Sequence, residues 1–95
     1  MNLKTAINNG YQKLKDNNIK TALLDSEILL SEAIDKTREF IILNNQNIIH
    51  QDDYKCYQNM IAQRAKGKPV AYLTNKKFFW NFIVKNGWVQ SMHQK

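Results

Sequence analysis

Apolar side chains recur along the first part of the chain at the spacing of amphipathic helices. Between residues 3 and 15 the apolar positions are Leu3, Ala6, Ile7, Tyr11 and Leu14. Steps of three and four residues place these side chains on one helical face, and Asn2 is a suitable N-cap in front of them. The polar run at residues 16–18 predicts the end of this first helix.

A second stripe predicts a helix that follows Thr21, the expected N-cap. Its members are Ser26, Leu29, Leu30, Ala33 and Ile34. Their spacing fits one buried helical face, on which we expect Leu30 to be fully buried. The neighbouring carboxylates Asp25 and Glu27 are interpreted as residues that cap the start of the helix or complement its dipole.

Two further helices are expected before the chain breaks at Gly67. Thr37 is expected to open a short helix that runs through residues 40–43, with the polar loop 44–47 behind it. A fourth helix is expected to begin near residues 52 and 53 and to end at Gly67. Its predicted buried face carries Tyr54, Tyr57, Ile61 and Ala65.

The string Arg64-Ala-Lys-Gly-Lys-Pro69 has the composition of a helix end followed by a new helix. Gly67 is the residue type found just past a helix C-terminus, where the backbone becomes left-handed. Pro69 cannot continue that helix but suits the first turn of the next one. We therefore expect residues 69–74 to form about one helical turn.

From Lys76 onward the pattern changes to a period of two. The apolar positions Phe78, Trp80 and Phe82 alternate with Lys77, Phe79 and Asn81. This alternation favours extended structure, and Asn86-Gly87 is a turn signal. The sequence therefore predicts a mainly α fold: a bundle of four or five helices over residues 1–75, a C-terminal β-hairpin over residues 76–90 and a tail over residues 91–95.

Length and composition place the chain among small soluble proteins. Its 95 residues make one domain. No apolar run exceeds four residues, whereas about 20 are needed to cross a bilayer, and the N-terminus lacks a secretory core. We expect a cytoplasmic protein with no membrane contact. Cys56 is the only cysteine, which excludes an internal disulfide and a Cys-x-x-Cys metal site and predicts a buried thiol.

Positive charge is concentrated in the second half of the chain. Residues 51–95 carry eight basic and two acidic side chains, whereas residues 1–50 carry six of each. Such asymmetry can mark an anionic partner. Twelve of the 14 basic residues are lysines, and Asn and Ile are abundant, which A/T-rich codons also produce. A nucleic-acid surface usually has more arginine, so both explanations stay open.

The sequence contains no recognisable catalytic set. It has neither a Gly-x-Gly-x-x-Gly nor a Gly-Lys-Ser/Thr phosphate loop, and no Gly-x-Ser-x-Gly elbow. His50 and His93 are far apart and lack a metal-binding pattern. The aromatic residues 78–82 with Lys76 and Lys77 are able to stack nucleic-acid bases, but such clusters more often form a core or a docking face for another domain.

Four segments, in this order, resemble one known family. They are Asp25-Ser-Glu-Ile-Leu-Leu30, Arg38 with Phe40 and Leu43, Arg64-Ala-Lys-Gly-Lys-Pro-Val-Ala-Tyr-Leu73, and Lys77-Phe-Phe-Trp80. Together they resemble the N-terminal domain of the HemK/PrmC family, the peptide-chain release-factor glutamine methyltransferases. Its pattern is Asp-Ala-Glu-x-Leu-Leu, then Arg-Arg-x-x-Gly-x-Pro-x-x-Tyr-(Ile/Leu)-x-Gly, then Glu-Phe-(Trp/Tyr). The resemblance covers about residues 3–84.

The chain departs from the family pattern at three places. Asn75 stands where the family usually has Gly, and Lys77 replaces the usual Glu. After Val84 the family's Leu-Ile-Pro-Arg-Pro-x-Thr-Glu segment is missing, which suggests truncation or a change of reading frame. The family's Asn-Pro-Pro-Tyr motif is also missing, so no catalytic, cofactor-binding or metal-binding residue is carried over.

The resemblance implies a release-factor-recognition domain that is not catalytic alone. S-adenosylmethionine is the cofactor of the full-length family and is not expected to bind this chain. The residues expected to contact a release factor, weakly, are Arg64, Lys66, Lys68, Tyr72, Lys76 and Lys77. Those expected to contact the family's methyltransferase domain are Phe78, Phe79, Trp80 and Phe82. The alternatives are a small basic RNA- or ribosome-binding module and a helical adaptor for another protein.

Overall fold

A computed structural model describes residues 1–75, which form five α-helices. The helices are α1 (Leu3–Asp16), α2 (Ala22–Ile34), α3 (Arg38–Leu43), α4 (Gln51–Ala65) and α5 (Val70–Thr74). The mainly α prediction is thus confirmed over these residues, whose only β pairing is an isolated bridge between Asn2 and Ile48. The predicted hairpin at residues 76–90 and the tail at residues 91–95 lie outside the described residues.

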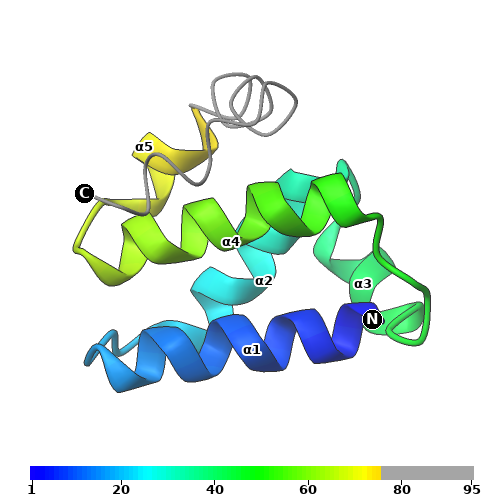
Figure 1. The fold of residues 1–95 in the computed structure, drawn as a ribbon, viewed down its shortest axis with the longest axis horizontal. Helices are drawn as coiled ribbons and strands as arrows, with labels where there is room; N and C mark the ends of the chain where they lie inside the picture. The colour runs from blue at the N-terminus through cyan, green and yellow to red at the C-terminus, as the bar shows by residue number, and fades with distance from the viewer. Residues whose placement is uncertain (76–95) are drawn as a thin grey trace.

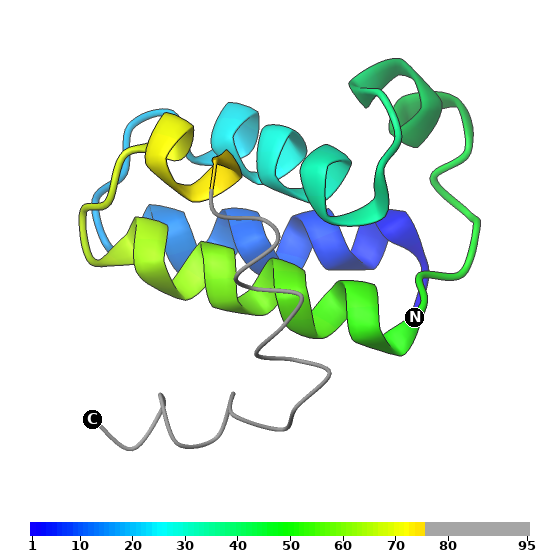
Figure 2. The same ribbon diagram turned by 90° about the horizontal axis from the view of Figure 1, so that it is seen from above.

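Three long helices pack against one another and enclose the core. Helices α1 and α4 lie side by side and run in the same direction, while α2 runs the opposite way and packs on both (Figures 1 and 2). The short helices α3 and α5 lie at opposite ends of α2 (Figure 2). None of the helices in residues 1–75 has the length and apolar character needed to cross a membrane.

The predicted cap of α1 is present, and Thr37, expected to open α3, caps that helix. The Asn2 side chain accepts a hydrogen bond from the Thr5 N–H at 2.8 Å, and the Thr37 hydroxyl accepts one from the Phe40 N–H at 3.0 Å. Each satisfies a backbone donor that the helix itself leaves unpaired. Helix α1 ends at Asp16, and Asn18 takes a left-handed backbone conformation with φ of 64° just beyond it.

The buried stripe of α2 matches its prediction closely. Ser26, Leu29, Leu30 and Ala33 are buried, with Leu30 fully enclosed, and Ile34 is half-buried.

Thr21 is the N-cap residue of α2, as the sequence predicts, but its side chain makes no capping hydrogen bond. Its hydroxyl donates instead to Asp25 Oδ2 at 2.8 Å. Its ψ of 33° departs from the extended conformation usual for a capping side chain.

Helix α4 begins close to where the sequence predicts. Its first residue is Gln51, and His50 is the N-cap, with the imidazole Nδ1 accepting from the Asp52 N–H at 3.1 Å. The helix thus starts near Asp52 and Asp53 as expected, with an imidazole nitrogen in the capping role usually filled by a hydroxyl or carboxylate. Both aspartates lie in the first turn, where they complement the helix dipole.

The break between α4 and α5 forms as predicted. Gly67 has φ of 103° and its N–H donates to the Arg64 carbonyl oxygen at 2.9 Å. The Lys68 N–H donates to the Gln63 carbonyl oxygen at 3.2 Å. This pair of bonds is the Schellman arrangement that ends many helices. Pro69 then precedes the first residue of α5.

Backbone hydrogen bonds tie the N-terminus to the loop that leads into α4. The Leu3 N–H donates to the Asn47 carbonyl oxygen at 2.9 Å, the Lys4 N–H to the Asn45 carbonyl oxygen at 3.0 Å, and the Ile49 N–H to the Met1 carbonyl oxygen at 3.0 Å. The first residues of the chain are therefore part of the folded domain.

Candidate functional site

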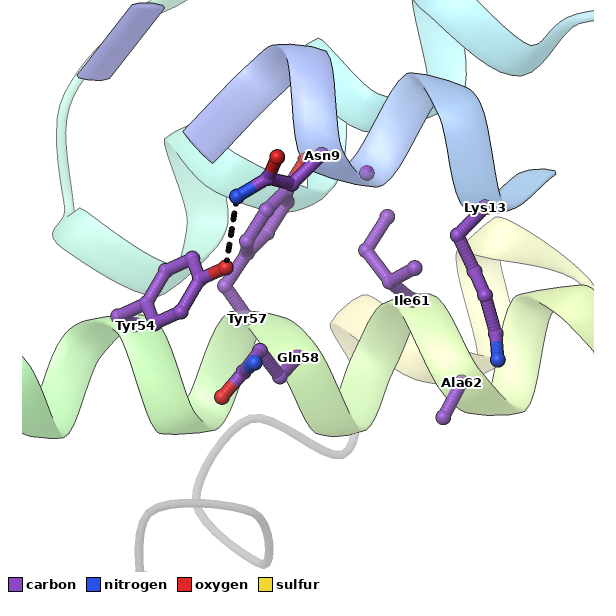
Figure 3. Close-up of a pocket in the computed structure, with 8 residues that line it drawn as sticks. Asn9, Lys13, Tyr54, Tyr57, Gln58, Ile61 and Ala62 are labelled. Atoms are coloured by element: carbon purple, nitrogen blue, oxygen red, sulfur yellow. Dashed lines mark hydrogen bonds between the residues drawn. The ribbon is translucent and has the colours of Figure 1, made fainter. Parts of the chain in front are cut away.

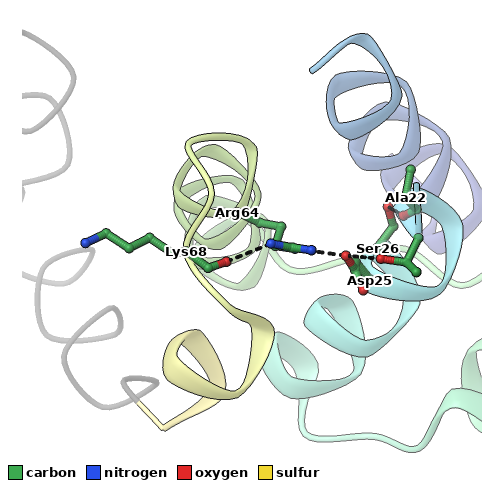
Figure 4. Close-up of polar contacts among 6 residues, drawn as sticks. Ala22, Asp25, Ser26, Arg64 and Lys68 are labelled. Carbon is green, nitrogen blue, oxygen red and sulfur yellow. Dashed lines mark hydrogen bonds and ion pairs between the residues drawn. The ribbon is translucent and has the colours of Figure 1, made fainter. Parts of the chain in front are cut away.

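A buried carboxylate on α2 is paired with an arginine at the end of α4. Arg64 Nε donates to Asp25 Oδ2 at 2.9 Å, and the same oxygen accepts from the Thr21 hydroxyl at 2.8 Å. The Asp25 side chain is only 7% exposed and that of Arg64 20%. A carboxylate so far from water needs such partners to stay charged, which explains why Arg64 points inward (Figure 4).

Arg64 also contacts the turn that follows α4. One of its terminal nitrogens donates to the Lys68 carbonyl oxygen at 3.1 Å. The guanidinium thus lies between α2 and the turn at residues 66–69 and is bonded to both (Figure 4). Because a guanidinium presents several donors in one rigid plane, it can bond two acceptors in different directions at once.

The other arginine of the sequence, Arg38, makes a more exposed ion pair. It donates to Glu27 Oε1 at 2.9 Å, with side-chain exposures of 45% for Arg38 and 18% for Glu27. Both carboxylates of the Asp25-Ser-Glu27 motif therefore pair with arginines from later motifs. The residues that carry the family resemblance join α2 to the rest of the bundle.

Two of the expected partner-binding residues come together on the surface. Lys68 is exposed, and its Nζ lies 5.5 Å from the centroid of the Tyr72 ring, at a distance typical of a cation–π contact. Tyr72 is 45% exposed, and Lys66 is exposed on the same turn. We call Lys66, Lys68 and Tyr72 the α4–α5 basic edge.

The remaining expected site residues lie outside the described part of the chain. They are Lys76, Lys77, Phe78, Phe79, Trp80 and Phe82. Lys76 and Lys77 directly follow Asn75, the C-cap residue of α5. In the sequence they therefore come shortly after Tyr72 of the α4–α5 basic edge.

A shallow cleft lies between α1 and α4 (Figure 3). Its volume is about 270 Å³, and its lining comprises Asn9, Gly10, Lys13, Tyr54, Tyr57, Gln58, Ile61 and Ala62. Across one end, Asn9 Nδ2 donates to the Tyr54 hydroxyl at 3.1 Å (Figure 3). Sequence reasoning did not identify this cleft, because it depends on the packing of two helices that are far apart in the chain.

Tyr57 crosses from α4 to α1 beneath this cleft. Its side chain is 1% exposed and lies against Gly10. Its buried hydroxyl has no hydrogen-bond partner within residues 1–75. Burial raises the pKa of the Tyr57 phenol well above its ordinary value, and the nearby Ser26 hydroxyl opposes this shift only in part. The hydroxyl is therefore a neutral, enclosed group.

The pairing of Asp25 with Arg64 was also missed by sequence reasoning. The available signal was the position of Asp25 next to Ser26, on the buried side of a helix. A carboxylate on a buried face needs a cation, and the chain has only two arginines, Arg38 and Arg64. Within residues 1–75 no group of His, Cys, Asp and Glu side chains could hold a metal ion.

The described residues define a small helical domain with an exposed basic turn. Comparison with known proteins gives its family: the family described as the PrmC N-terminal domain matches residues 5–74. The chain belongs to this family.

Curated relatives agree with this assignment. The release factor glutamine methyltransferase of Leptospira interrogans is 33% identical over 79 residues, which are 83% of this chain and 28% of the relative. That of Clostridium acetobutylicum is 36% identical over 89 residues, or 92% of this chain and 31% of the relative. The bifunctional methyltransferase of Rickettsia bellii is 31% identical over 80 residues, which are 82% of this chain and 14% of the relative.

The chain spans less than a third of the length of these relatives. No solved structure matches it.

The cleft between α1 and α4 does not have the size or the lining of an S-adenosylmethionine site. The α1–α4 cleft has about 270 Å³, below the roughly 300–1,000 Å³ of small-molecule sites. No Asp or Glu lines it, whereas nucleoside sites commonly bind the ribose hydroxyls through a carboxylate.

Proposed function

We propose that this chain is the release-factor-recognition domain of a peptide chain release factor glutamine methyltransferase and is not catalytic alone. The observation that carries the proposal is the match of residues 5–74 to the PrmC N-terminal domain. Relatives that share these residues are named as enzymes that methylate release-factor glutamine, and this chain aligns with less than a third of their length. On this proposal, methyl transfer is carried out by the part of a full-length methyltransferase that this chain does not align with.

The α4–α5 basic edge is the proposed contact surface. Lys66, Lys68 and Tyr72 are exposed together, and Lys76 and Lys77 follow in sequence. We further propose that residues 76–90 form the hairpin that connects to a methyltransferase domain, with Phe78, Phe79, Trp80 and Phe82 contacting it. Exposed ion pairs contribute only about 0–1 kcal/mol each, so the isolated chain should bind weakly.

A purified release factor is expected to bind the labelled chain with an affinity on the order of micromolar or weaker. The variant Lys66→Glu/Lys68→Glu should bind up to about tenfold more weakly, because it reverses two exposed charges. The measurement is a fluorescence-anisotropy titration at two salt concentrations, since screening should weaken the wild-type complex at high salt.

Two controls make this titration decisive. Lys4→Glu/Lys55→Glu carries the same charge change in the N-terminal halves of α1 and α4, away from the turn that follows α4, and should leave the affinity unchanged. A parallel titration uses single-stranded RNA, which also binds in a salt-dependent way. Micromolar RNA binding without release-factor binding would refute the proposal in favour of an RNA-binding module.

S-adenosylmethionine is expected not to bind the isolated chain. The cleft is small and lacks a carboxylate, and the sequence has no glycine-rich loop of the kind that α/β nucleotide sites use. Isothermal titration calorimetry at millimolar ligand should give only heats of dilution. A saturable isotherm in the micromolar range would contradict the assignment of cofactor binding to the rest of the protein.

A further inference from the structure

We propose that Arg64 is a positioning residue: it ties the turn at residues 66–69 to α2 and so presents Lys68 and Tyr72 to the release factor. The inference rests on the proposed function, because it names the residue that supports the proposed contact surface. It also changes the expected role of Arg64 itself, from a cation that meets the partner to one that holds the partner-binding turn in place.

Arg64 is already bonded within the domain on both sides of its guanidinium. Its guanidinium bonds Asp25 on one side at 2.9 Å and the Lys68 carbonyl oxygen on the other at 3.1 Å. Its side chain is 20% exposed. A cation that is paired, bonded to backbone and largely covered has few free donors with which to bind an approaching protein.

Asp25, the residue of α2 that Arg64 binds, is itself held in place. Asp25 Oδ2 accepts from the Thr21 hydroxyl as well as from Arg64, and the Asp25 side chain is 7% exposed. Screening by water is slight at such a site, so the pair is stronger than an exposed one. Arg64 thus connects the turn to a rigid part of the bundle.

The bond from Arg64 to the Lys68 carbonyl group bears on the start of α5. Lys68 lies directly before Pro69, the N-cap of α5, so the position of its carbonyl group sets the direction in which the chain enters that helix. The Lys68 Nζ lies over the Tyr72 ring of α5 at 5.5 Å. A displaced Lys68 carbonyl would therefore move the cation and the ring relative to each other.

The test uses Arg64→Lys in the full chain. Lysine keeps the charge beside Asp25, but its single ammonium lacks the planar fork that reaches both acceptors. We expect a melting temperature near that of the wild type. We also expect about tenfold faster amide exchange at Gly67 and Lys68 and about tenfold weaker binding of the release factor, the effect of losing one charge-assisted bond.

The matched control is Arg38→Lys, which alters the other arginine–carboxylate pair, between α3 and α2, and not the pair that holds the turn. It should change neither the amide exchange at Gly67 and Lys68 nor the affinity. Unchanged exchange and affinity in Arg64→Lys would overturn the inference while leaving the proposed function intact. If the wild-type chain does not bind the release factor, the proposed function fails and with it the presentation of Lys68 and Tyr72. Amide exchange then still decides whether Arg64 orders the turn.

Discussion

Replacing Leu30 with alanine is expected to lower the free energy of unfolding by about 2–5 kcal/mol. Leu30 is fully buried in the middle of α2, the helix that packs against all four others. The loss combines the transfer free energy of the deleted atoms with the cavity they leave. Domains of this kind have only about 5–15 kcal/mol in total, so the effect should be plain in a urea denaturation followed by circular dichroism.

Leu43→Ala is the matched control for this substitution. It deletes the same atoms from a side chain that is 82% exposed at the end of α3, and such surface changes usually stay within about 0.5 kcal/mol. Equal losses from the two variants would mean that α2 does not turn its Leu29–Leu30 face into the core.

Replacing Gly10 with alanine is expected to destabilise the domain by about 2 kcal/mol, although alanine favours helices over glycine by about 1 kcal/mol. A Cβ atom at position 10 would overlap the Tyr57 hydroxyl and would lie 2.8 Å from the ring carbon that bears it and 3.0 Å from Ile61 Cδ1. Tyr57 is enclosed, so it cannot move away cheaply, and overpacking outweighs helix propensity. Thermal unfolding measures the result.

A double-mutant cycle isolates the hydroxyl group in this contact. Tyr57→Phe alone should be nearly neutral, because the hydroxyl that it removes is buried without a hydrogen bond in the described residues. In the Tyr57→Phe background, Gly10→Ala should cost about 1 kcal/mol less, a coupling typical of residues in contact. Identical costs in both backgrounds would show that the tyrosine oxygen does not set the spacing of α1 and α4.

Sequence reasoning predicted what depends on neighbours along the chain. The apolar stripe around Leu30 follows from helical spacing alone, and the Asn2 and Thr37 caps follow from side chains that reach a backbone donor three residues ahead. The Gly67 turn follows from the one residue type that accepts a left-handed backbone without strain. All of these are local, and all were confirmed.

Contacts between distant segments were not predicted from the sequence. Asp25 and Arg64 are 39 positions apart, and nothing in their spacing says that α2 and the end of α4 meet. Gly10 lies against Tyr57 of α4, a contact that no residue near Gly10 in the sequence indicates. Thr21 was expected to cap α2, but its hydroxyl donates a hydrogen bond to the Asp25 carboxylate one turn later.

The hydrogen bonds between residues 1–4 and residues 45–49 bear on the order of events during synthesis. Because translation proceeds from the N-terminus, α1 emerges long before the loop that binds its first residues. Those bonds close only after residue 49 has left the ribosome, and the core face of α1 gains its α4 neighbours later still. Until α4 has emerged, α2 is the only long helix against which α1 can pack. An N-terminal fusion would place its linker directly beside the Met1–Ile49 bond.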